Sequence, residues 1–96
     1  MRQLTVPPMI SRQIGACSLT RTVMVRVLAG LHDELPQQYD RFKAFRNPDD
    51  TTEFFYFHGI TDGDLMHTFT FRVDDSTSPE HLLVVALEHV SRPRRE

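Results

Sequence analysis

The chain has 96 residues, which is long enough for one domain with a single hydrophobic core. Its hydrophobic fraction of 40% and charged fraction of 25% are ordinary for a globular protein, and no apolar run approaches the ~20 residues of a membrane-spanning helix. The formal net charge of −2 argues against a nucleic-acid-binding protein, since such proteins usually present a basic surface.

A few residue types indicate compartment and origin. Residues 1–11 lack the apolar segment of a signal peptide, and Cys17 is the only cysteine, so no internal disulfide can form. Both observations predict a cytoplasmic protein. Lys43 is the only lysine among the 11 basic residues, and this arginine bias hints at a bacterial, phage or mobile-element source.

Residues 3–6 predict a short strand, which Pro7 and Pro8 end because proline donates no hydrogen bond to a sheet. A third strand is useful here, since a two-stranded hairpin alone is only marginally stable in water. Residues 7–17 give no clear element, and Gly15 interrupts their pattern.

Residues 18–35 have the spacing of an amphipathic helix. Ser18 or Thr20 would cap its start, and Pro36 would stop it. The competing interpretation is a strand over residues 22–28, which are rich in β-branched side chains. The helix is favoured by a long stripe of apolar residues on one half of the helical wheel, namely Leu19, Val23, Met24, Val27, Leu28, Leu31 and Leu35.

A second helix is expected over residues 36–46, with Pro36 at its first position and Tyr39 and Phe42 on one side. Residues 47–50, Asn-Pro-Asp-Asp, then predict a loop. Two helices joined this closely would form a bend.

Residues 52–74 give the clearest signal, an antiparallel hairpin. Asp62 and Gly63 separate two aromatic-rich runs, and this dipeptide favours the positive φ values of a type I′ turn. A two-residue loop at 62–63 and a four-residue loop at 61–64 predict the same register. On one face the pairs are Ile60–Leu65, His58–His67, Tyr56–Phe69 and Phe54–Phe71, and on the other they are Glu53–Arg72, Phe55–Thr70, Phe57–Thr68 and Gly59–Met66.

The segment from residue 78 to residue 92 predicts a third helix. Ser78, Pro79 and Glu80 form a typical start, with a capping hydroxyl, a proline at the first position and an acid near the positive end. Pro93 would end it, and residues 92–96 predict a mobile basic tail. The core stripe of this helix would hold Leu82, Leu83, Ala86, Leu87 and Val90.

The predicted fold is α+β. An antiparallel hairpin, with the N-terminal strand as an optional third strand, packs against two or three helices in the order (β)-α-α-β-β-α within a single domain spanning residues 1–96. The expected core places Leu19, Val23, Val27 and Leu31 with Leu83, Ala86, Leu87 and Val90 over Phe54, Tyr56, Phe69 and Phe71.

This arrangement leaves apolar side chains without an obvious cover. Phe55, Phe57 and Met66 lie on the second face of the hairpin, while Val84 and Val85 fall outside the stripe of the last helix. Either another element of the chain covers them or they form an apolar patch that contacts a partner. A dimer of identical chains would cover such a patch as well as a hetero-partner would.

Acidic residues gather at the open end of the hairpin. Asp49 and Asp50 precede its first strand, and Asp74 and Asp75 follow its second. The two groups would form one acidic edge beside the aromatic strands. Such an edge would steer a basic partner toward the apolar patch.

His58 and His67 are the strongest ligand candidates, since the predicted register sets them directly opposite one another. Two imidazoles do not complete a metal site, and no dense ligand cluster accompanies them, so no metal or other cofactor is predicted. A buried pair of this kind would instead have depressed pKa values and make stability depend on pH.

No motif identifies catalytic residues, and Cys17 is the only candidate thiol. The leading interpretation is therefore a small non-enzymatic protein-binding or inhibitory accessory protein. The runner-up is a small enzyme or metal-binding protein that uses the histidines. A nucleic-acid-binding protein ranks third.

Overall fold

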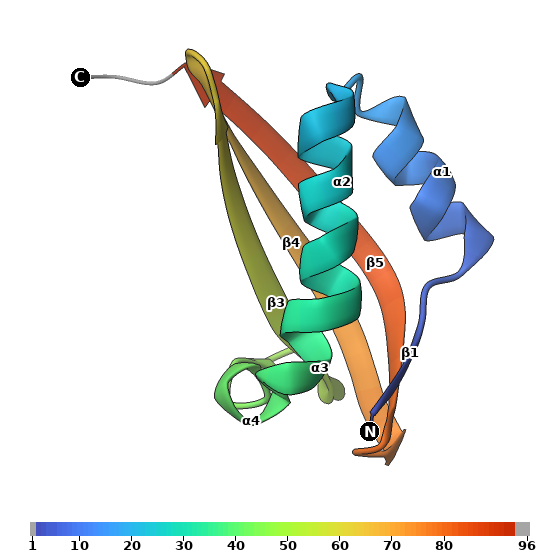
Figure 1. Ribbon diagram of the computed structural model, residues 1–96. Coiled ribbons are helices and arrows are strands. Elements are labelled where there is room, and N and C mark those ends of the chain that lie inside the picture. Colours follow the sequence, from blue (N-terminus) through green and yellow to red (C-terminus); the bar gives the residue numbers. More distant parts are fainter. Residues whose placement is uncertain (1, 94–96) are drawn as a thin grey trace.

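A computed structural model describes residues 2–93, and it consists of one five-stranded sheet with helices on one of its faces (Figure 1). The α+β class is confirmed, but the sheet is larger than predicted and the last described element is a strand rather than a helix. The elements in chain order are β1 (Gln3–Thr5), α1 (Pro8–Ala16), α2 (Arg21–Ala29), the π-helical segment η1 (Gly30–Glu34), α3 (Leu35–Gln37), α4 (Tyr39–Phe42), β2 (Arg46–Asn47), β3 (Asp50–Asp62), β4 (Leu65–Ser78) and β5 (His81–Pro93).

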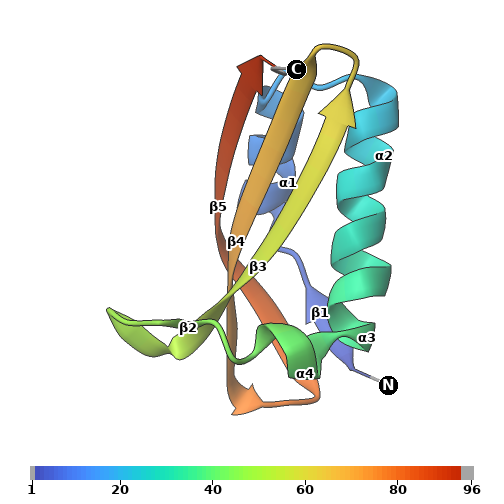
Figure 2. The ribbon, with the colours of Figure 1, turned by 90° about the vertical axis from the view of Figure 1, so that its left-hand side faces the viewer.

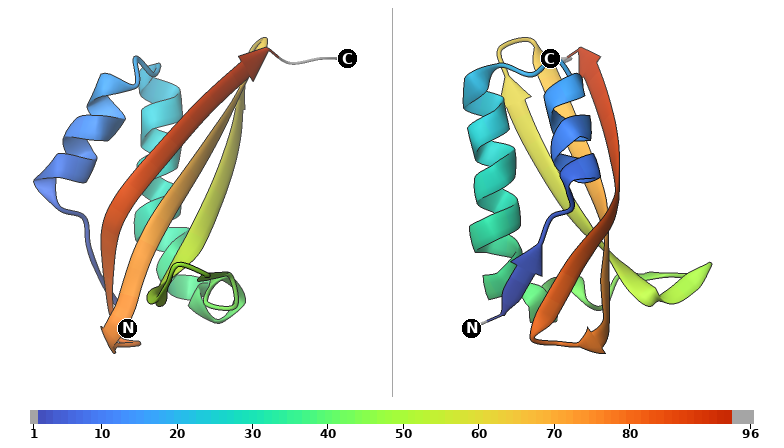
Figure 3. Two further views of the ribbon diagram at one scale, coloured as in Figure 1. Left: turned by 180° about the vertical axis from the view of Figure 1, so that it is seen from behind. Right: turned by 90° about the vertical axis from the view of Figure 1, so that its right-hand side faces the viewer.

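The sheet has the strand order β1-β5-β4-β3-β2, and its long strands β3, β4 and β5 are all antiparallel. Only the short β1 runs parallel to its neighbour, β5. Helices α1 and α2 lie on the same side of these strands, as the views from behind and from the right show (Figure 3). The opposite side of the long strands has no helix over it (Figure 2).

The hairpin of β3 and β4 confirms the predicted element but not its register. Asp62 pairs with Leu65, so the two loop residues are Gly63 and Asp64 rather than Asp62 and Gly63. Gly63 has φ +57°, and glycine at the first loop position is the preference of a type II′ turn. Every partner therefore moves by two residues. Since side chains alternate along a strand, each one still lies on the predicted face.

The shift changes which side chains meet. Phe54 lies opposite Val73 instead of Phe71, and Glu53 lies opposite Asp74 instead of Arg72. Arg72 now lies opposite Phe55, but its guanidinium still reaches the Glu53 carboxylate diagonally at 3.5 Å.

The predicted C-terminal helix is wrong, because residues 81–93 form the strand β5. This segment pairs with β4 along most of its length, and with β1 at residues 81–83. Its β-branched Val84 and Val85 fit a strand, and Leu82 and Val84 are buried in alternation. Ser78 therefore caps no helix. Its hydroxyl oxygen accepts a hydrogen bond from the Glu80 N–H at 3.1 Å within the β4–β5 turn.

The helical half of the chain matches the prediction in part. Helix α2 exists and is capped by Thr20, whose hydroxyl oxygen accepts a hydrogen bond from the Val23 N–H at 3.3 Å. Pro36 does not stop the helix, because the chain passes through η1 into α3, which has this proline in its first turn. The expected helix over residues 36–46 is replaced by the short α3 and α4.

Helix α1 has no counterpart in the sequence prediction, although its signals are present. Pro8 stands at the first helical position, where its missing N–H costs nothing. Ile10 and Ile14, one helical turn apart, are both buried against the sheet. The short β1 confirms the predicted N-terminal strand.

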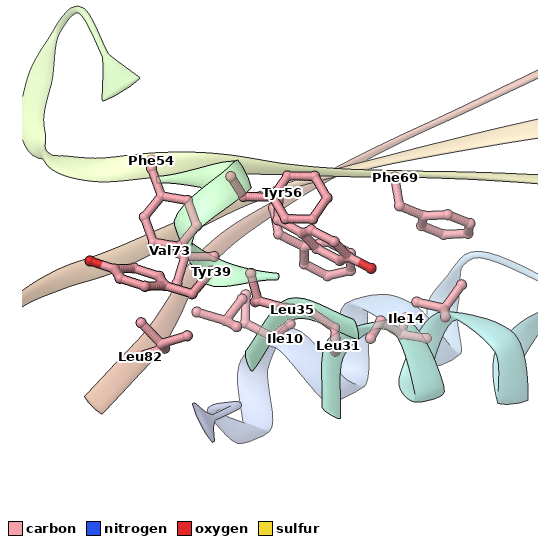
Figure 4. Packing of buried hydrophobic residues seen from close by; sticks show 14 of the residues in the cluster. Ile10, Ile14, Leu31, Leu35, Tyr39, Phe54, Tyr56, Phe69, Val73 and Leu82 are labelled. Carbon is pink, nitrogen blue, oxygen red and sulfur yellow. The ribbon is translucent and has the colours of Figure 1, made fainter. Parts of the chain in front are cut away.

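The core lies between the helices and one face of the sheet (Figure 4). Leu83, Ala86 and Val90 are predicted core residues, but they lie on the sheet face away from the helices. Leu83 and Val90 are 39% and 48% exposed, because a strand alternates where a helix would keep all three inside. Ring packing is specific: Phe42 meets Tyr56 edge to face at 4.8 Å between centroids. The predicted core residues Val23, Val27, Leu31, Phe54, Tyr56, Phe69 and Phe71 are all buried.

The mobile basic tail predicted over residues 92–96 is wrong for its first two residues, because Arg92 and Pro93 belong to β5. Residues 94–96 lie outside the described part of the chain. No helix within residues 2–93 has the length and apolar character needed to cross a membrane.

Candidate functional site

The side of β3, β4 and β5 that faces away from the helices has no second layer over it (Figure 2). We call it the open sheet face. Strand pairing places its side chains in five rows across the three strands. The rows are Glu53–Asp74–Leu83, Phe55–Arg72–Ala86, Phe57–Thr70–Glu88, Gly59–Thr68–Val90 and Thr61–Met66–Arg92.

Aromatic side chains gather on the β3 side of the open sheet face. The ring of Phe45 meets the ring of Phe57 edge to face, with 5.9 Å between their centroids, and the ring centroid of Phe55 also lies 5.9 Å from that of Phe57. Phe45 is held there by its carbonyl, which accepts a hydrogen bond from the Phe55 N–H at 2.8 Å. Phe45 and Phe57 are nevertheless 49% and 45% exposed. Met66 and Val90, both 48% exposed, continue the apolar surface across β4 and β5.

Shallow grooves run along this face. One is lined by Met66, Thr68, Thr70 and Val90 of β4 and β5. Thr70 is shorter than Phe57 opposite it, and Thr68 lies opposite Gly59, which leaves a trough between the aromatic side and β5. The turn between β2 and β3 reaches across the lower part of the sheet (Figure 2). A second groove lies beside this turn, and its lining includes Asn47, Asp49, Phe55, Arg72 and Glu88.

The predicted partner-binding residues divide into two groups. Phe55, Phe57 and Met66 lie on the open sheet face. Val84 is fully buried in the core beneath the helices, so it contacts no partner in the folded chain. Val85 is partly buried at the irregularity where β5 shifts its register against β4.

The acidic edge is smaller than the sequence suggested. Arg46 binds the Asp75 carboxylate with two hydrogen bonds of 2.7 Å, and the Tyr39 hydroxyl donates a third. The bond from Arg46 holds the pKa of the Asp75 carboxyl below its usual value, although burial opposes this. The Asp75 side chain is only 6% exposed. Asp75 therefore ties β4 to β2 and α4 and offers no free charge to a partner.

The other three predicted acids remain near the surface but have local roles. Asp50 accepts a hydrogen bond from the Thr52 N–H, and Asp74 accepts one from the Ser76 N–H, as aspartates in turns commonly do. Asp49 borders the second groove of the open sheet face. Of the four, Asp49 is the best placed to meet a partner bound on that face.

The predicted pair of His58 and His67 does not form, because His58 lies opposite Phe69 and His67 lies beside Ile60. The partner of His67 is His89 of β5, with 3.0 Å between Nδ1 of His67 and Nε2 of His89 and 5.2 Å between the ring centroids. Sequence reasoning missed this pair because it placed His89 on a helix. Among residues 2–93, no three His, Cys, Asp or Glu side chains are grouped to hold a metal ion.

The His67–His89 pair predicts a loss of stability on acidification. Burial lowers the pKa of His89, and the neighbouring His67 lowers it further. The folded state therefore favours neutral His89, and the stabilisation is complete above the unfolded value of ~6.5 and is lost as pH falls below it. We expect His89→Gln, which cannot titrate, to flatten the decline of the urea midpoint between about pH 7 and pH 5.

The matched control is His32→Gln, which removes an exposed histidine on η1. It should keep the wild-type dependence of the urea midpoint on pH. If His89→Gln and the wild type decline in parallel, the pair does not contribute to acid sensitivity.

A second polar cluster joins the π-helical segment to β3. The Tyr56 hydroxyl lies 3.2 Å from Nδ1 of His58, and the Glu34 carboxylate lies 3.7 Å from the same nitrogen. Burial, and then the charge of Glu34, raise the pKa of Tyr56, so its hydroxyl stays protonated and can donate a hydrogen bond. Gly30 leaves the room that these side chains occupy. Sequence reasoning missed this cluster, and its one signal was a glycine within a predicted helix.

This cluster borders a shallow hollow that Arg26, Asp33 and Gln37 also line. π-Helical segments are frequent at functional sites, so the hollow beside η1 is a candidate binding site. However, the main hydrogen-bonding partner of His58 is the buried Tyr56 hydroxyl. The contacts therefore fit the role of joining α2 and η1 to the sheet.

Cys17, the only thiol, is not activated as a nucleophile. Its Sγ donates a hydrogen bond to the Gln13 carbonyl at 3.0 Å, and burial raises the pKa of the thiol. A reactive cysteine needs the opposite shift, toward the thiolate.

Comparisons of the chain with protein-family models, with curated proteins and with solved structures found no match. Function is therefore inferred from the surface that the fold leaves open.

Proposed function

We propose that the protein is a small non-enzymatic binding protein, an accessory or inhibitory factor, that holds a protein partner on its open sheet face. The observation that carries this proposal is the exposure of Phe45, Phe57, Met66 and Val90 on one uncovered surface. Monomeric proteins rarely leave large apolar patches in water, and aromatic residues and methionine are enriched in interfaces.

Phe57 is the best candidate for the central anchor of the interface. It contacts both Phe45 and Phe55, so its ring is held in place before a partner arrives. Anchors of this kind lose little conformational entropy on binding. Arg72 and Glu88 lie near it on the neighbouring strands and would form the polar rim.

The partner's charge is suggested by the residues around this anchor. Asp49 borders the open sheet face, and Asp50 lies next to it at the start of β3. These acids favour a partner with basic groups beside its apolar contact, because complementary charges speed association and exclude wrong partners.

The proposal predicts that Phe57→Glu abolishes partner binding while the fold persists. A partner recovered from extract of the source organism is purified, and its affinity for the wild type and for the variant is measured by calorimetry. Loss of a central aromatic anchor costs 2 kcal/mol or more, so we expect the Kd to rise at least ~30-fold. The thermal unfolding midpoint should change little, because the side chain is 45% exposed.

The matched control is Val25→Glu. Val25 is an exposed apolar residue, 58% exposed, on α2, away from the open sheet face. The Val25→Glu substitution should leave the affinity for the partner unchanged. A partner that binds Phe57→Glu as tightly as the wild type would refute the proposed binding surface.

A further inference from the structure

Strand β5 has a free edge along its second half. Within residues 2–93, β1 pairs only with residues 81–83 of β5, so the far side of residues 86–93 has no strand beside it (Figure 2). An unpaired edge of this length presents backbone N–H and C=O groups to another strand. Proteins usually protect such an edge with lysines, prolines or bulges. The segment is limited by a register irregularity near Val85 at one end and by Pro93 at the other. Between these limits Glu88 and Arg92 are charged, but among residues 2–93 no strand pairs with this edge.

The opposite edge of the sheet is less accessible. Strand β2 pairs with the first part of β3, at Phe54 and Asp50. Helix α2 lies beside the remainder of β3, and its capping residue Thr20 donates a side-chain hydrogen bond to Asp62 at 3.3 Å (Figure 2). The second half of β5 is therefore the edge that another chain can reach.

The side chains on this edge are complementary to themselves. Glu88, Val90 and Arg92 all lie on the open sheet face and are exposed. If two β5 strands pair antiparallel around a two-fold axis at Val90, Glu88 of each chain lies opposite Arg92 of the other, and Val90 lies opposite its own copy. Opposite charges across two strands stabilise a sheet, and so do β-branched neighbours.

Other registers fit less well. A two-fold axis perpendicular to the sheet must pass midway between the two copies of one residue, because the two side chains of each cross-strand pair lie on the same face. An axis at Glu88 would set two carboxylates against each other. An axis at His89 would place Val90 opposite Glu88 and Ala86 opposite Arg92, which leaves both charges without partners. An axis at Ser91 would place Val90 opposite Arg92. Within residues 86–93, only the axis at Val90 pairs Glu88 with Arg92.

We propose that the protein forms a symmetric dimer through antiparallel pairing of two β5 strands centred on Val90. The dimer joins two open sheet faces into one surface with a Phe57 on each half. The role of this dimer in partner binding rests on the function proposed above, but the formation of the dimer does not. Because edge pairing buries less area than a standard interface, we expect a reversible, concentration-dependent dimer.

The test exchanges the charges across the axis. Glu88→Arg sets arginine against Arg92, and Arg92→Glu sets glutamate against Glu88, so each variant alone should associate at least ~10-fold more weakly in sedimentation equilibrium. An equimolar mixture of the two variants should form a heterodimer as tightly as the wild type, since every pair is then opposite in charge. The double variant Glu88→Arg/Arg92→Glu should also regain the wild-type association.

Arg72→Glu is the control, because Arg72 lies on the open sheet face but on β4, away from the edge. It should leave the dimer unchanged, whereas a dimer formed face to face would weaken. Circular dichroism spectra should be the same for all variants, since the three positions are exposed. A wild type that stays monomeric at all accessible concentrations would overturn the proposal. So would a dimer that is insensitive to the charge exchange.

The result is separable from the test of the proposed function. A monomer that binds its partner through Phe57 would refute only the dimer. A dimer that responds to charge exchange but has no Phe57-dependent partner would refute only the binding function.

Discussion

Replacing Phe71 with alanine is expected to lower the free energy of unfolding by about 3–5 kcal/mol, the usual cost of truncating a buried aromatic side chain. Phe71 lies on the central strand β4 and is fully buried between the sheet and the helices. Its ring stacks on Tyr56, with 6.0 Å between centroids and 27° between planes. A domain of this size has a total stability of about 5–15 kcal/mol, so the variant should unfold at much lower urea concentration.

The matched variant is Phe57→Ala, which truncates the same residue type on the neighbouring strand but on the open sheet face. Phe57 is 45% exposed, so we expect a loss of no more than about 1 kcal/mol. Both values are measured by urea denaturation followed by circular dichroism. Equal losses would mean that something covers both faces of the sheet, and the apolar surface assigned to a partner would not exist.

The two faces of the β3–β4 hairpin could be predicted from the sequence, but its register could not. Alternation along a strand separates Tyr56 and Phe71 from Phe57 and Thr70 whatever the turn. A shift of two residues keeps every side chain on its face, so burial alone does not choose between the two registers. The choice depends on the turn, where both Asp62-Gly63 and Gly63-Asp64 are acceptable loop pairs. The structure uses the second, with Gly63 at positive φ.

The sequence predicts a helix over residues 78–92, whereas residues 81–93 form a strand, because the local signals of this segment conflict with its surroundings. Leucine, alanine and glutamate favour a helix, and Ser78-Pro79-Glu80 resembles a helix start. Pairing with β4 overrides these preferences, because a third long strand satisfies the backbone of β4 on its second side. Val84 and Val85, which did not fit the helical stripe, were the residues that indicated a strand.

The positions of the candidate residues follow from the correct faces of the hairpin and from the wrong assignment of residues 81–93. Phe55, Phe57 and Met66 were placed correctly because they depend only on alternation. The His67–His89 pair and the free edge at Val90 were missed because they require β5. The salt bridge between Arg46 and Asp75 joins residues far apart in sequence, and no local sequence pattern predicts such a contact.

A second large effect is expected at Gly30, where alanine should destabilise the protein by about 1–3 kcal/mol despite its better helix propensity. Gly30 has ordinary helical angles, φ −59° and ψ −46°, so backbone preference alone would favour alanine by about 1 kcal/mol. A Cβ there would lie 2.7 Å from the Tyr56 hydroxyl and 2.9 Å from Cε1 of His58. His58 is able to move, but the Tyr56 ring is fully buried against Phe42 and Phe71 and cannot.

The same substitution at Gly15 should have the opposite sign. Gly15 lies in α1 with open space around its Cα, so Gly15→Ala is expected to stabilise the protein by about 0.4–1 kcal/mol. The origin of the Gly30 effect is tested with Tyr56→Phe, which removes the hydroxyl that the new methyl group would meet. In a double-mutant cycle, Gly30→Ala should cost less in the Tyr56→Phe background than in the wild type, by about 0.5 kcal/mol or more. Equal costs in both backgrounds, or a Gly30→Ala variant as stable as the wild type, would show that the tyrosine does not confine this position and that the π-helical segment packs more loosely on β3 than the contacts imply.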